Sequence, residues 1–158
     1  MDLMHVGATW LHLMATVAML GYYAIVGLLI LPVLRRIVPS RELGETIGAV
    51  ERRALPVIIA SLTIFLATGV YLMGADARYG GVGNVTSSTW ASLFLAKHLV
   101  VVVMVGLGVY FDALVVRGIA PPEATAQTTD VRRLTIVAGL MTLLGAVVLL
   151  LTATAQAS

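Results

Sequence analysis

Four apolar stretches, each long enough to cross a lipid bilayer, take up most of this 158-residue chain. They run from about residue 8 to 34, 54 to 74, 90 to 116 and 134 to 155. A helix crosses the roughly 30 Å hydrocarbon core with about 20 apolar residues, and it satisfies its own backbone hydrogen bonds there. The sequence therefore predicts an all-α integral membrane protein: a single transmembrane domain over residues 1–158, built as a four-helix bundle.

The composition leads to the same class of protein. Hydrophobic residues make up 59% of the chain and charged residues 11%, with a mean hydropathy of +1.00. This leaves too little polar surface to cover a soluble globule. The net charge of +2 is small and the basic residues stand in short clusters, so we expect the lipid bilayer, and no nucleic acid, as a partner. The absence of cysteine excludes disulfides, thiolate metal sites and thioether-linked cofactors.

The basic residues also predict an orientation. Five of the ten lie between the first and second stretches, and three lie between the third and fourth. An excess of lysine and arginine marks the cytoplasmic connections of a membrane protein. We therefore expect both termini and the middle connection to lie outside, with the protein in a bacterial inner (plasma) membrane.

Two histidines lie inside the predicted spans. His12 is in the first and His98 in the third, each a few residues from the outer end of its span. An imidazole in hydrocarbon is costly unless it faces the interior of the bundle and has a partner. Two imidazoles at matching depth can bind one iron atom from opposite sides, as in a bis-imidazole heme b. We therefore expect His12 and His98 to be metal ligands and heme b to be the cofactor.

Three further residues are expected to bind or orient this cofactor. Thr16 lies one helical turn after His12 and could hold the imidazole ring in place. Lys97 and Arg78 lie near the outer surface, where heme propionates would emerge. Two axial imidazoles leave no open position for oxygen, so the expected function is electron transfer, with a quinone or a redox protein as partner.

Other interpretations stay open at this point. Thioethers, which suit cuprous ion, and an imidazole lie near the outer half of the first helix: Met4, His5, Met14 and Met19. The histidines could also be structural residues or quinone contacts that bind no metal. An accessory subunit of a larger membrane complex would instead bind no cofactor and expose small-residue faces around Gly139 and Gly145. Association into a homo-oligomer also stays open.

Two expectations concern the cytoplasmic end of the bundle. Leu43, Ile47 and Val50 at helical spacing predict a short amphipathic helix that lies on the membrane face. Asp112 lies near the cytoplasmic end of the third span, where we expect it to pair with an arginine. The candidate partners are Arg35, Arg53 and Arg133.

Short motifs in the first three spans resemble those of the copper-resistance protein D family and of the four-helix bacterial protoporphyrinogen oxidase. They are Trp10-Leu11-His12-Leu13 followed by Gly21, Leu31-Pro32-Val33-Leu34-Arg35, Arg52-Arg53, Thr68-Gly69, Trp90 and Lys97, spread over roughly the first 115 residues. The resemblance implies that His12 is a heme or metal ligand and that Lys97 is a site residue. It also implies copper uptake or porphyrin oxidation as alternative functions. The role of His98 comes from the depth argument alone.

Overall fold

The computed structural model describes residues 2–79, 81, 88–119 and 124–157, and the ordered elements in these ranges are all helical. The elements are α1 (Leu3–Ile25), the π-helical turn η1 (Val26–Ile30), α2 (Leu31–Ile37), α3 (Ser40–Ala75), α4 (Thr89–Ile119) and α5 (Ala124–Ala157). α1, η1 and α2 form one continuous rod. This rod, α3, α4 and α5 each contain a segment long and apolar enough to cross a membrane. The prediction of four helices with the length and composition of membrane spans is confirmed. The fold is compatible with an integral membrane protein.

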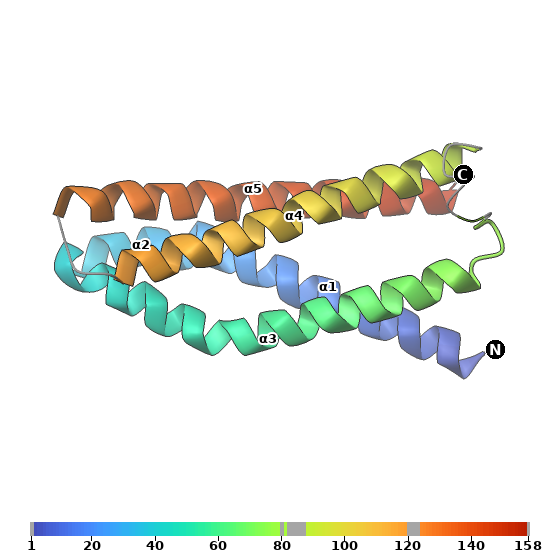
Figure 1. The fold of residues 1–158 in the computed structure, drawn as a ribbon, viewed down its shortest axis with the longest axis horizontal. Coiled ribbons are helices and arrows are strands. Elements are labelled where there is room, and N and C mark those ends of the chain that lie inside the picture. The colour runs from blue at the N-terminus through green and yellow to red at the C-terminus, as the bar shows by residue number, and fades with distance from the viewer. Residues whose placement is uncertain (1, 80, 82–87, 120–123, 158) are drawn as a thin grey trace.

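The helices form a bundle in which α1 and α4 lie diagonally opposite, because each packs against both α3 and α5 (Figure 1). Both termini lie at the same end of the bundle, which we call the terminal end. There the pair α1 and α3 diverges from the pair α4 and α5. The pairs converge at the opposite end, which we call the far end.

The most tightly packed side chains lie in the far half of the bundle. Phe111 and Leu31 are each 1% exposed, and both belong to a cluster that also contains Leu43 and Ile47. α3 is continuous from Ser40 to Ala75, so these last two residues belong to a bundle helix. The expectation of a separate amphipathic helix on the membrane face is wrong, because the apolar side of this segment packs against other helices.

A π-helical turn precedes Pro32 in the first rod. Proline lacks an N–H, and its ring clashes with the carbonyl four residues earlier, so a helix that contains proline must adjust locally. Here the N–H of Leu31 donates to the carbonyl of Val26, five residues earlier. Gly27 lies in this turn, and a Cβ at that position would be 2.9 Å from the Cβ of Ala138 on α5. The glycine therefore allows close contact between η1 and α5.

The two glycines expected on an exposed small-residue face differ in their surroundings. Gly145 is buried, and a Cβ there would overlap the Leu20 side chain of α1. Gly139 is partly exposed and has nothing within 4 Å of the corresponding position. The expectation of an exposed face at Gly145 is wrong, because α1 already packs against it.

We predict that Gly27→Ala lowers the free energy of unfolding by about 1–3 kcal/mol, because the added methyl group must displace Ala138 or move α5. Thermal unfolding in a fixed detergent, followed by circular dichroism, measures the change. Gly21→Ala is the matched control on α1, because no atom lies within 4 Å of its added Cβ and alanine favours a helix over glycine. Equal destabilisation by both substitutions would contradict the proposed close contact.

Candidate functional site

His12 and His98 lie on the helix faces that line a cavity of about 170 Å³, which opens to the surface of the bundle beside Ile59 and Val109. On α1 the lining includes Thr16 and Met19, which follow His12 at i+4 and i+7. On α4 it includes Val101, which follows His98 at i+3. Residues at these spacings share one face of a helix. Both histidines therefore lie just beyond the cavity, toward the terminal end.

His12 is half-buried against α3. Its Nδ1 is 3.1 Å from the carbonyl oxygen of Phe65 and 3.0 Å from the hydroxyl of Thr68, and its ring stacks on Phe65 with centroids 4.4 Å apart. Gly69 leaves room for the ring, since a Cβ there would lie 3.2 Å from Cε1 of His12. A carbonyl oxygen can only accept, so Nδ1 carries the hydrogen and Nε2 keeps its lone pair.

His98 has a similar arrangement within α4. Its Nδ1 donates to the carbonyl oxygen of Phe94 at 2.7 Å, and the two rings lie 4.2 Å apart between centroids. The lone pair of His98 is therefore also on Nε2. His98 is exposed, however, and within the described part of the chain the two imidazoles do not contact each other. His12 is thus held by Phe65 of α3, whereas His98 is held by Phe94 of its own helix.

Thr16 has a different role from the one expected. Its hydroxyl donates to the backbone carbonyl of His12 at 2.8 Å, a common way for a threonine to bond within an apolar helix. The groups that hold the His12 ring are Phe65 and Thr68 on α3, which the sequence reasoning did not assign to it. Thr68-Gly69, one of the motifs that carry the family resemblance, is the sequence feature that could have indicated this contact with His12.

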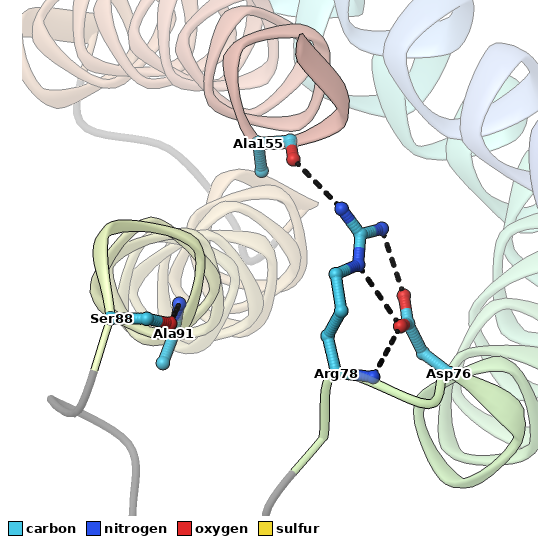
Figure 2. Close-up of polar contacts among 5 residues, drawn as sticks. All are labelled: Asp76, Arg78, Ser88, Ala91 and Ala155. Atoms are coloured by element: carbon cyan, nitrogen blue, oxygen red, sulfur yellow. Dashed lines mark hydrogen bonds and ion pairs between the residues drawn. The ribbon is translucent and has the colours of Figure 1, made fainter. Parts of the chain in front are cut away.

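Arg78 joins three elements at the terminal end (Figure 2). Its guanidinium donates to both carboxylate oxygens of Asp76 at 3.1 Å and to the carbonyl oxygen of Ala155 on α5 at 3.4 Å. It also lies 4.9 Å from the ring centroid of Trp90 on α4. The hydrogen bonds from Arg78 lower the pKa of the Asp76 carboxyl below its usual value.

Phe94 is the centre of an aromatic cluster on α4. Its ring stacks on Trp90 at 5.1 Å and lies 6.2 Å from the ring of Tyr79. The ammonium of Lys97 is 4.9 Å from the Phe94 centroid, which is a cation–π contact. This cluster therefore supports both Lys97 and the neighbouring His98.

The structure thus divides the predicted site residues into two groups. His98, Lys97 and Arg78 gather around the aromatic cluster at the start of α4. His12 and Thr16 lie on α1, where their side chains bond to α3 and to the α1 backbone respectively. Both groups belong to the half of the bundle toward the terminal end, where the helix pairs diverge (Figure 1).

A second polar group, at the side of the cavity nearer the far end, was not predicted. Glu51 is 7% exposed, lines the cavity, and accepts a hydrogen bond from the hydroxyl of Tyr22. Asp112 lines the same cavity, with its carboxyl within hydrogen-bonding reach of Glu51. The available signal was the i+4 spacing of Leu43, Ile47 and Glu51, which places the carboxyl on the apolar face of α3.

The expected ion pair of Asp112 with Arg35, Arg53 or Arg133 is not formed in the described part of the chain. Asp112 follows His98 by fourteen residues, which keeps it on the face of α4 that lines the cavity. The three arginines are exposed. The rotation of α4 about its own axis therefore turns this carboxyl toward the interior and away from them.

No three histidine, aspartate or glutamate side chains gather to hold a metal ion in the ranges that the structure describes. The candidate copper ligands are also dispersed. Met4, Met14 and His5 are exposed, whereas Met19 lines the cavity. These four side chains therefore do not converge on one cavity.

We predict that Asp76 titrates below its usual pKa of 3.8, because hydrogen bonds from Arg78 favour the carboxylate. Its contribution to stability is then complete above pH 3.8 and is lost as the pH falls through the lower folded value. Carbon-13 NMR of the aspartate carboxyl groups measures the midpoint. Arg78→Gln should raise this midpoint toward 3.8, whereas Arg53→Gln should leave it unchanged. An unaltered midpoint in Arg78→Gln would refute the assigned cause.

No protein-family model matches this chain, and no curated protein or solved structure is similar to it at a significant level. The resemblance to the copper-resistance and protoporphyrinogen oxidase proteins therefore rests on the short motifs alone. One of these motifs acquires a physical role in the fold, because Thr68 and Gly69 contact the ring of His12.

Proposed function

We propose that this protein is a membrane cytochrome b-like electron-transfer protein that holds one heme b between α1 and α4 at the terminal end. His12 and His98 would be the axial ligands, each through Nε2. One observation carries the proposal: both rings have Nδ1 bonded to a backbone carbonyl, which leaves Nε2 available to a metal.

This bonding pattern is typical of histidines that ligate metals. Such a residue usually donates its other ring N–H to a carbonyl or carboxylate, which selects the tautomer and orients the ring. Thr68 and Gly69 restrain His12 further, and Phe94 supports His98. A porphyrin supplies four of the six iron ligands, so two imidazoles complete the coordination and no cluster of three protein ligands is needed.

The size of the cavity restricts where the macrocycle would lie. A cavity of about 150 Å³ holds a molecule of benzene, so the 170 Å³ space is too small for a tetrapyrrole. The macrocycle would lie outside it, between α1 and α4 toward the terminal end, with Thr16 on the inner side. Lys97 would then be the cation available to the propionates, whereas Arg78 would have to exchange its hydrogen bonds to Asp76 for bonds to a propionate.

A heme with both axial positions filled supplies one-electron transfer and has no open position for oxygen. The excess of lysine and arginine in the two connections at the far end would make that end cytoplasmic. The heme and both termini would then face the outside of a bacterial inner membrane. A quinone in the bilayer or a partner redox protein would exchange electrons with the site, and association into a homo-oligomer or a larger membrane complex is compatible with this role.

A second candidate follows from the unequal surroundings of the histidines. His12 is half-buried and held by α3, whereas His98 is exposed. Ligation by His12 alone would leave one axial position of the iron open, as a protoporphyrinogen oxidase-like enzyme would require. Lys97, which lies beside His98 on the Phe94 ring, would then belong to the substrate site.

We predict that protein purified in detergent and reduced with dithionite shows the sharp alpha and beta bands of a six-coordinate heme b. His12→Ala and His98→Ala should each weaken these bands greatly, because each substitution removes one axial ligand. His5→Ala is the matched control, since His5 is exposed on the same helix as His12. The visible spectrum and the heme content per chain are the two measurements.

The outcomes separate the candidates. Loss of the bands in His12→Ala but not in His98→Ala would favour the oxidase-like function, and porphyrin oxidation that depends on Lys97 would support it. Protein isolated with no heme absorbance, and unable to take up added hemin, would refute both candidates.

A further inference from the structure

The hydroxyl of Tyr23 faces the cavity without a hydrogen-bond partner in the described part of the chain. The Tyr23 side chain is 5% exposed and lines the cavity. Among the described residues, every fully enclosed polar side-chain atom has a hydrogen-bond partner, whereas this hydroxyl has none. The hydroxyl is therefore not enclosed by protein, and its accessible side is the one toward the cavity.

The packing of the Tyr23 ring fixes the position of this hydroxyl. The ring meets Phe111 of α4 edge-on, with centroids 5.7 Å apart, and meets Tyr22 edge-on at 5.1 Å. The hydroxyl lies 3.1 Å from the position that a Cβ would take on Gly108, so it reaches the backbone of α4 at a place where a larger residue would crowd it. The donor is thus held in place by two helices.

The other polar side chains that line the cavity already have partners. Glu51 accepts a hydrogen bond from Tyr22 and lies within hydrogen-bonding reach of Asp112. Thr16 donates to the backbone of α1. A hydroxyl in an apolar environment is unfavourable when it has no acceptor. The cavity therefore favours a ligand that brings an acceptor, such as a carbonyl oxygen, to Tyr23.

The rest of the cavity indicates the remainder of the ligand. Its volume of about 170 Å³ is close to that of a cavity of about 150 Å³ that holds benzene, so a single six-membered ring fits. The wall is otherwise apolar, as at Leu62 and Met104. The cavity opens beside Ile59 and Val109, which are exposed and lie in segments apolar enough to cross a membrane. The opening would therefore face hydrocarbon, and an apolar chain on the ring could pass through it.

We infer that this cavity binds the head group of a membrane quinone, with a ring carbonyl accepting from the Tyr23 hydroxyl and the apolar chain leaving beside Ile59 and Val109. A quinone combines the three features that fit the cavity: a single ring, acceptor oxygens and a long apolar chain. The choice of a quinone over other ring-bearing lipids with a carbonyl group rests on the proposed electron-transfer function. The inference names the quinone, and not a redox protein, as the partner, and its binding can be measured without heme.

Isothermal titration of the full-length protein in detergent tests the inference. The probe is decylubiquinone, and decylbenzene is an analogue with a ring and the same chain but no acceptor; heats from protein-free micelles are subtracted. We expect saturable binding of one quinone per chain and at least about fivefold weaker binding of decylbenzene. Tyr23→Phe should weaken quinone binding by a similar factor and leave decylbenzene unchanged, because it removes one hydrogen bond and keeps the ring against Phe111. Tyr110→Phe, an exposed position on α4 outside the cavity lining, is the matched control.

Val109→Trp supplies an independent variant, because this exposed side chain can be enlarged without disturbing the core. The indole should narrow the opening and weaken quinone binding, whereas Val116→Trp, seven residues further on the same exposed face of α4, should leave it unchanged. Equal affinity for the two probes would refute the inference and indicate an apolar cavity that accepts any lipid chain. So would unchanged quinone binding in both Tyr23→Phe and Val109→Trp, or no saturable binding to the parent protein. Saturable binding that persists in His12→Ala, where the heme bands should be lost, would support this site independently of the heme proposal.

Discussion

Helices that already lie in a bilayer gain little hydrophobic energy by associating, so their assembly depends on close backbone contact and on polar side chains that bond across helices. This chain has both kinds of contact. Gly27 allows η1 to lie against Ala138 of α5. Tyr22 donates to Glu51, which connects α1 to α3. The ring of His12 bonds to Phe65 of α3, nearer the terminal end of the same helix pair. Without these contacts, the large apolar side chains would face lipid as readily as each other.

These contacts are distributed unevenly along the bundle. The far end contains the tightly packed core around Phe111 and Leu31, and the terminal end is wider because the two helix pairs diverge. The proposed heme position follows from this gradient. A flat macrocycle requires the wider end, where His12 and His98 lie. The core at the far end fixes the positions of the helices relative to one another.

The two histidines show how far prediction from the sequence could go. Their depth follows from counting residues along apolar helices, because each residue adds about 1.5 Å. The contacts of their rings do not follow from such counting. His12 bonds across to Phe65, fifty-three residues away, whereas His98 bonds to Phe94 of its own helix. Arg78 likewise was expected to lie near the outer surface, but its contacts with Asp76 and with the end of α5 depend on the path of residues 76–79 after α3.

The sequence by itself determined that four long apolar helices form, because hydrocarbon thickness and helical hydrogen bonding act on each segment separately. The tertiary structure decided which face of each helix meets a neighbour. It joined the segment at Leu43 to the core, turned Asp112 toward Glu51 instead of the arginines, and buried Gly145 under Leu20. These outcomes depend on the rotation and crossing of helices that are distant in the chain. An apolar pattern in one helix carries no information about them, because lipid and a neighbouring helix accept the same side chains.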